Sequence, residues 1–130
     1  MTKSIRGILP AAVFTAAALL GVGGLAAAGP AHAAPGVSDI SQGSGNRAGV
    51  RCVQHGVNNW AQRTGKGRPL EEDGLFGKAT AKWVEKFQGA SDLDIDAIVG
   101  KNTGNSILDN LTGDGNWRAD CYKHIPSTRR

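Results

Sequence analysis

The stretch DGLFGKATAKWVEKFQ, residues 73–88, joins a turn to the pattern of an amphipathic helix. Asp73 and Gly74 form a strong turn dipeptide, because Asp can hydrogen-bond the backbone ahead of it and Gly accepts a positive φ without steric cost. Four later residues then follow the i, i+3, i+4, i+7 spacing of one helix face: Thr80, Trp83, Val84 and Phe87. The stretch therefore predicts a sharp turn followed by a helix with one buried face.

This turn-helix unit occurs twice. Residues 96–103, DAIVGKNT, align with residues 73–80, DGLFGKAT, and are followed by a second apolar helix face. Neither unit can bury its apolar face alone, so the two units should pack against each other and against a preceding helix. That first helix is expected to be capped by Ser44 or Asn46 and to end near Thr64. The sequence predicts an all-α fold, a compact three-helix bundle with two pseudo-repeated turn-helix units. The second apolar face comprises Thr103, Ile107, Leu108 and Leu111.

The motif D-G-x-F-G-x-x-T-x-x-x-V-x-x-F-Q, preceded by a helix with Val50, Val53-Gln54 and Val57-Asn58, resembles the small three-helix peptidoglycan-binding domain found beside many bacterial cell-wall hydrolases. The likeness runs from about Val50 to Leu108. It implies a surface that binds the cell wall, without a cofactor or a metal. The residues that match the motif are expected mainly to build the fold: Asp73, Gly74, Phe76, Gly77, Thr80, Val84 and Phe87.

Three features depart from the family pattern. Trp83 stands where the family usually carries Ala, and Ala97 replaces the Gly of the second turn. The region after Leu111 adds a cysteine and Trp117. A bulky ring at position 83 could fill the family's groove, in which case the scaffold would bind a different ligand.

The first 33 residues have the pattern of a secretory signal peptide. Lys3 and Arg6 precede an apolar stretch, residues 8–25, and Ala31-His32-Ala33 has the small-x-small form of a cleavage site. A membrane anchor fits less well, because Gly and Pro interrupt the apolar stretch. We expect a secreted protein, extracellular or associated with the cell wall, with no membrane segment after cleavage.

The exported part divides into three segments. Residues 34–46 hold too little apolar surface to order themselves and are expected to be a flexible leader. Residues 47–123 form the peptidoglycan-binding-like domain, and residues 124–130 a basic tail whose end, Arg129-Arg130, is expected to be frayed. An even pair of cysteines in an exported protein, Cys52 and Cys121, predicts a disulfide that ties the C-terminal region to the first helix.

Charge and catalytic motifs exclude several functions. Cleavage removes two positive charges and lowers the net charge from +4 to +2. The sequence has no long basic stripe interleaved with aromatic residues, so a nucleic-acid partner is not expected. Zinc catalysis needs three protein ligands, but only His55 and His124 remain after cleavage. Cys52 and His55 share a helix face and could form a thiol nucleophile with its base, although a disulfide to Cys121 is the simpler interpretation.

Two acidic stretches have similarly simple explanations. Residues 71–73, EED, are adjacent in a polar loop, whereas a glycosidase needs two carboxylates on opposite sides of a sugar. Residues 92–96, DLDID, begin like a calcium loop, but Ala97 and Thr103 stand where a Gly and a bidentate Glu belong. We therefore expect solvated charge in the first stretch and the repeated turn in the second.

Binding is the remaining class. Cell-wall glycan and its stem peptides offer sugar faces, amides and carboxylates, which require aromatic planes, hydrogen-bonding groups and a few cations in a shallow groove. Trp60 and Trp83 fall on the buried faces of their helices. Trp117 fits two roles equally well: its ring stacks against a ligand, or it covers the open side of the helix bundle. The candidate ligand-binding residues are Asn58, Asn59, Gln62, Arg63, Asp73, Gln88 and Trp117.

The sequence thus predicts a secreted, monomeric, non-catalytic module that binds bacterial peptidoglycan. The second hypothesis is a protein-protein interaction module, such as an inhibitor or accessory subunit of a cell-wall enzyme. This hypothesis is motivated by the composition of the exported part. A wall-binding module would be expected to hold another domain at the cell wall, and the exported part contains no second domain. A very small hydrolase, the third interpretation, lacks a recognisable catalytic constellation.

Overall fold

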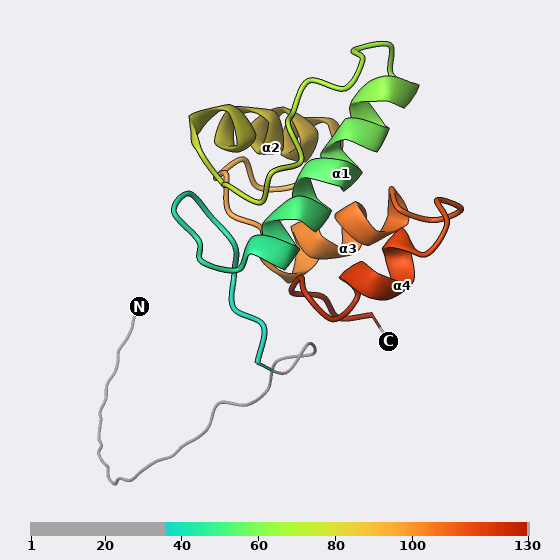
Figure 1. The fold of residues 1–130 in the computed structure, drawn as a ribbon. Coiled ribbons are helices and arrows are strands. Elements are labelled where there is room, and N and C mark those ends of the chain that lie inside the picture. The colour runs from blue at the N-terminus through green and yellow to red at the C-terminus, as the bar shows by residue number, and fades with distance from the viewer. Residues whose placement is uncertain (1–35, 130) are drawn as a thin grey trace, which may run out of the picture. The chain divides into compact units, whose positions relative to one another are not determined.

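The computed structural model describes residues 36–129, which form helices joined by loops (Figure 1). The helices are α1 (Arg47–Arg63), α2 (Lys78–Ala90), α3 (Lys101–Asp109) and α4 (Trp117–Cys121). These residues contain no strand, so the all-α prediction is confirmed. The sequence predicted three helices, whereas the described residues contain a fourth, α4, after Leu111. Within this range no helix is both long and apolar enough to cross a membrane. The predicted signal peptide, residues 1–33, lies outside the described residues.

The other helices pack around α1. It crosses the centre of Figure 1 and contacts α2, α3 and α4, and α3 also contacts α4. The Asn46 side chain accepts the Gly49 N–H at 2.9 Å and so caps the start of α1, one of the two caps that the sequence offered. Gly56 allows α3 to approach closely, because a Cβ there would lie 2.8 Å from Cγ2 of Ile107.

The predicted apolar faces meet in one core. Val84 and Phe87 of α2 and Ile107 and Leu108 of α3 are all fully buried. Trp60 and Trp83 are only partly buried against this core. Trp60 packs edge-to-face on Phe87, with ring centroids 5.6 Å apart, so its main role is in packing.

The first turn is built around the buried side chain of Gln54 in α1. Its Nε2 donates to Oδ1 of Asp73 at 3.0 Å, to the Leu75 carbonyl at 3.1 Å and to Oγ1 of Thr80 at 3.2 Å. The Gly74 N–H in turn donates to its Oε1 at 2.9 Å. The Leu75 backbone N–H and the Gln54 amide lower the pKa of Asp73, since both bond its charged form. Asp73 therefore belongs to the turn itself.

The second turn repeats these bonds around Gln88 of α2. Its Nε2 donates to Oδ1 of Asp96 at 2.9 Å, to the Ile98 carbonyl at 3.0 Å and to Oγ1 of Thr103 at 3.1 Å. The Ala97 N–H donates to its Oε1 at 3.0 Å. Each turn is thus held by a glutamine from the helix before it, which gives the repeat seen in the sequence a physical basis.

The segment before α1 packs more closely than predicted. Ile40 is fully buried and exchanges two backbone hydrogen bonds with Val99, at 3.0 and 2.8 Å. The Gly43 N–H donates to the Phe76 carbonyl at 3.1 Å. The prediction of a flexible leader over residues 34–46 is therefore wrong for residues 40–46, because one well-placed isoleucine anchors a segment that is polar on average.

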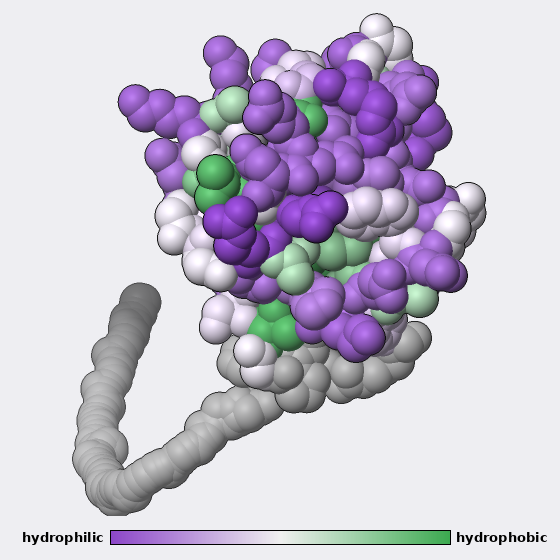
Figure 2. All heavy atoms as spheres, viewed as in Figure 1, coloured by the Kyte–Doolittle hydropathy of each residue, from purple (hydrophilic) through white to green (hydrophobic). Residues whose placement is uncertain are grey.

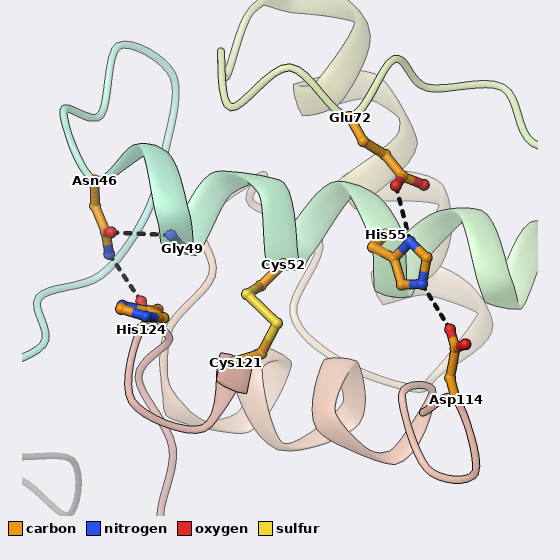
Figure 3. Close-up of a disulfide and its surroundings, with 8 residues drawn as sticks. All are labelled: Asn46, Gly49, Cys52, His55, Glu72, Asp114, Cys121 and His124. Atoms are coloured by element: carbon orange, nitrogen blue, oxygen red, sulfur yellow. Dashed lines mark hydrogen bonds and ion pairs between the residues drawn. A yellow bond between two sulfur atoms is a disulfide. The ribbon is translucent and has the colours of Figure 1, made fainter. Parts of the chain in front are cut away.

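The C-terminal segment is also packed. The disulfide between Cys52 and Cys121 is present, as predicted, and joins α1 to α4 (Figure 3). Ile125 beyond it is fully buried, and the Ser127 hydroxyl donates to Oδ1 of Asn105 at 2.6 Å. Residues 125–127 of the predicted basic tail therefore belong to the packed domain, because the disulfide brings this short segment onto α3. Arg130 lies outside the described residues.

The equivalence of the two turns can be tested at their left-handed positions. Gly74 has φ +78° and Ala97 has φ +60°, so the second turn holds an alanine where a side chain is strained. We expect Ala97→Gly to raise the free energy of unfolding by about 0.5–1 kcal/mol and Gly74→Ala to lower it by about 1–2 kcal/mol. Urea unfolding at one pH measures both.

Ala79→Gly, on the exposed side of α2, is the matched control and should lower stability by up to about 1 kcal/mol. A loss of stability in Ala97→Gly equal to that of the control would contradict the strain at position 97.

Candidate functional site

A polar network is centred on His55, which projects from α1 with a side chain only 12% exposed. Its Nδ1 lies 2.8 Å from Oε1 of Glu72, and its Nε2 lies 2.6 Å from Oδ2 of Asp114 (Figure 3). Both ring nitrogens thus lie within hydrogen-bonding distance of a carboxylate oxygen. His55 thereby links α1 to the loop before α2 and to the loop before α4.

Glu72 receives the densest set of hydrogen bonds. Its Oε2 accepts from Nδ2 of Asn58 at 2.8 Å and from Nη2 of Arg68 at 2.8 Å, in addition to the His55 contact. Burial alone would raise the pKa of Glu72, but the hydrogen bonds from Asn58, His55 and Arg68 outweigh it and lower the pKa. Glu72 is therefore held in its charged form.

Asp114 plays the corresponding part on the other side of the imidazole. Nδ2 of Asn59 donates to its Oδ2 at 2.8 Å, and the hydrogen bonds from Asn59 and His55 lower the pKa of Asp114. Arg68 connects the two halves, since its Nη1 donates to Oδ1 of Asn59 and to Oε1 of Gln62, both at 2.9 Å. The network thus fixes several α1 side chains in place.

Trp117, the first residue of α4, stacks on this network. Its ring lies nearly parallel to that of His55, with an angle of 10° and centroids 3.8 Å apart. The stack covers one face of each ring. It separates two hollows on the same side of α1.

We call these the amide hollow and the tryptophan hollow. The amide hollow has a volume of about 380 Å³ and the tryptophan hollow about 370 Å³. In Figure 2 a small apolar recess opens where α1 and α4 lie together, on a face that is otherwise mainly hydrophilic. The residues that characterise the amide hollow are His55, Asn59, Gln62, Arg63, Arg68 and Asp114. Those of the tryptophan hollow are Arg51, Cys52, Trp117, Asp120, Cys121 and His124.

The predicted ligand-binding residues divide between these places. Asn59, Gln62 and Arg63 come together in the amide hollow, and Trp117 lines the neighbouring one. Asp73 lies apart from both, at the first turn.

Two other candidates lie too deep to meet a ligand. Asn58 is 1% exposed, and its amide bonds the Leu70 backbone and Glu72. Gln88 is fully buried and holds the second turn. The structure does not support either as a contact residue, because each amide is engaged inside the protein.

Each of the two turns also lines a hollow, with a volume of about 420 Å³ at the first turn and about 280 Å³ at the second. Their six equivalent pairs of lining residues are Asp73 and Asp96, Leu75 and Ile98, Gly77 and Gly100, Lys78 and Lys101, Ala79 and Asn102, and Thr80 and Thr103. Their likeness follows from the shared turn geometry.

The sequence did not reveal the partners of His55. Glu72 and Asp114 lie 17 and 59 residues from it along the chain, so no local spacing joins the three. The one useful indication was the disulfide, because a bond from Cys52 to Cys121 must bring the neighbourhood of Asp114 close to α1.

Three catalytic arrangements considered in the sequence are not formed by the described residues. The His55 ring fills the space between Glu72 and Asp114 that a sugar would need between two catalytic carboxylates. Cys52 and Cys121 are both consumed by the disulfide. Within residues 36–129 no cluster of three or more His, Cys, Asp or Glu side chains is suited to a metal ion.

No protein-family model matches this chain, and searches of characterised proteins and of solved structures find no significant match. The residues and the geometry alone therefore support the functional proposal.

The charged network around His55 should make the free energy of unfolding depend on pH. Because folding lowers the pKa of Glu72, its ionised form stabilises the fold at neutral pH, and this contribution is lost as the pH falls below about 5. We expect Glu72→Gln to be less stable than the parent protein at pH 7, with a difference that shrinks steadily towards about pH 3. Urea unfolding across this range gives the comparison.

Glu71→Gln is the control. Glu71 is exposed and makes no hydrogen bond or ion pair with the other residues that the structure describes, so its pH profile should follow that of the parent. A stability difference for Glu72→Gln that stays constant with pH would show that the network does not hold the ionised carboxylate.

Proposed function

We propose that this protein is a secreted, non-catalytic module that binds bacterial peptidoglycan through the amide hollow, on a scaffold like that of the three-helix peptidoglycan-binding domains. The observation that carries the proposal is the gathering of Asn59, Gln62 and Arg63 around one open hollow with Arg68 and Asp114. These groups come from α1, from the loop before α2 and from the loop before α4.

The chemistry of the hollow suits a cell-wall ligand. Peptidoglycan presents acetamido groups and hydroxyls along its sugars and carboxylates on its stem peptides, and side-chain amides both donate to and accept from such groups. Arg63 is exposed and forms no ion pair with another residue in the range 36–129, so its guanidinium is available to a ligand carboxylate. The hollow therefore combines neutral and charged recognition.

The network also orders these groups before a ligand arrives. Asn59 is held by Asp114 and Arg68, and Gln62 accepts from Arg68. Side chains already fixed in place lose less conformational entropy on binding, which favours affinity in a shallow site.

The surface and the disulfide fit an exported module of this kind. The face in Figure 2 shows only small, separate apolar areas, whereas a stable protein-protein interface usually has an apolar centre. Disulfides persist in oxidising compartments outside the cytosol. The polarity of this face favours a polar wall polymer there, and the disulfide fits an exported protein of either kind.

Sedimentation with purified insoluble peptidoglycan tests the proposal. We expect the protein to pellet with the wall and to be released by soluble muropeptides. The double change Gln62→Ala and Arg63→Ala should weaken binding by about tenfold or more, because charged and neutral hydrogen bonds are lost together. Both residues are exposed, so the fold should remain intact.

Lys82→Ala is the matched control, since Lys82 is an exposed cation on α2 outside the hollow. Recovery of the parent protein only in the supernatant would refute wall binding. Recovery of a cell-wall enzyme with the protein in a separate pull-down would then support the accessory-protein alternative.

A further inference from the structure

The amide and tryptophan hollows share one face of α1. Ala48, Cys52, His55, Asn59 and Gln62 contribute to them at intervals of three or four residues, the spacing that keeps side chains on one side of a helix. Figure 3 shows Cys52 and His55 on the side of α1 that faces Cys121 and Asp114. At a rise of about 1.5 Å per residue, this face is about 20 Å long.

The region after Leu111 forms the opposite side of both hollows. Asp114 lines the amide hollow, and Trp117, Asp120 and His124 line the tryptophan hollow. The disulfide and the hydrogen bonds of His55 tie this region to α1 at two separate points. The two hollows therefore follow each other along α1, and we call them, with the His55–Trp117 stack between them, the trough.

Trp117 is placed to serve a ligand as well as the fold. Its inner face is covered by His55, which lines the amide hollow, while Trp117 itself lines the other hollow. The indole must therefore border the tryptophan hollow with its outer face or its edge. An aromatic face carries partial negative charge and favours the C–H groups of a sugar ring.

Polar groups of both signs surround this ring. Within the described residues, the side chains of Arg51, Asp120 and His124 make no hydrogen bond or ion pair, and all three line the hollow. They are free to bond sugar hydroxyls and amides. Cations and anions are mixed here, and Arg68, Glu72, His55 and Asp114 already bind one another in the neighbouring hollow. This balance favours a polar chain of low charge over a polyanion.

We infer that the tryptophan hollow is a second sugar site, in which Trp117 stacks on a pyranose ring, and that both hollows bind successive sugars of a single linear glycan. The inference rests on the proposed function and narrows it, since it names the glycan strand as the feature that the trough recognises. The stem peptides are then needed only for additional contacts.

The test uses β-1,4-linked N-acetylglucosamine oligomers of increasing length as probes. The chain has three tryptophans, so three indole N–H signals are expected by nuclear magnetic resonance. On titration with the hexamer, the signal of Trp117 should shift while those of Trp60 and Trp83 stay. The hexamer should bind about tenfold or more tightly than the dimer, because only the longer chain reaches both hollows.

Trp117→Phe identifies the signal and keeps an aromatic ring against His55. It should reduce the preference for the hexamer over the dimer, whereas Trp83→Phe, a control of equal chemistry on α2, should leave that preference unchanged. Thermal unfolding of both variants establishes that they fold.

A Trp117 signal that does not move, or a hexamer that binds no more tightly than the dimer, overturns the inference. If such a protein still pellets with peptidoglycan, the proposed function survives without the trough. A protein that binds the soluble hexamer at Trp117 but fails to pellet supports the trough and overturns wall binding. Failure in both assays refutes both.

Discussion

Buried polar side chains on α1 need hydrogen-bond partners, and this requirement determines where most of the segments around that helix pack. Gln54 is 1% exposed, and an unbonded amide at such a depth would cost about 1–3 kcal/mol. This amide is satisfied only if the first turn brings the Asp73 carboxylate, the Leu75 carbonyl and the Gly74 N–H to one point. Asn58, one turn further along α1, bonds the Leu70 backbone in the same way. These two amides determine where the loop before α2 runs, and this loop carries Glu72 into the site.

The local parts of this fold could be predicted from the sequence, whereas the long-range parts could not. The two turn-helix units were evident because the DG dipeptide and the helical spacing are contained within short windows. Ile40 and Ile125 were missed because each is a single apolar residue in a polar stretch, with no periodicity to indicate burial. Only contacts with partners distant in the chain, such as the pairing of Ile40 with Val99, make them part of the core.

The candidate site shows the same division. Asn59, Gln62 and Arg63 lie around one hollow, because their spacing on α1 places them together. Asn58 and Gln88 have the same chemistry, and composition cannot distinguish an amide that meets solvent from one that holds a turn. Burial depends on which neighbouring element arrives, and for both residues that element is a turn of the repeat.

The region after Leu111 gives this chain a face that the helical repeat alone would lack. α1 uses Gln54 to hold the first turn, and it uses the adjacent His55 to hold Asp114, roughly 100° further around the helix. One helix therefore anchors the repeat on one side and the C-terminal region on the other. Because the disulfide also fixes α4 to α1, the trough does not have to be assembled when a ligand binds. A shallow site on a small domain gains most from such rigidity, since it has little buried area with which to offset the loss of side-chain and loop entropy.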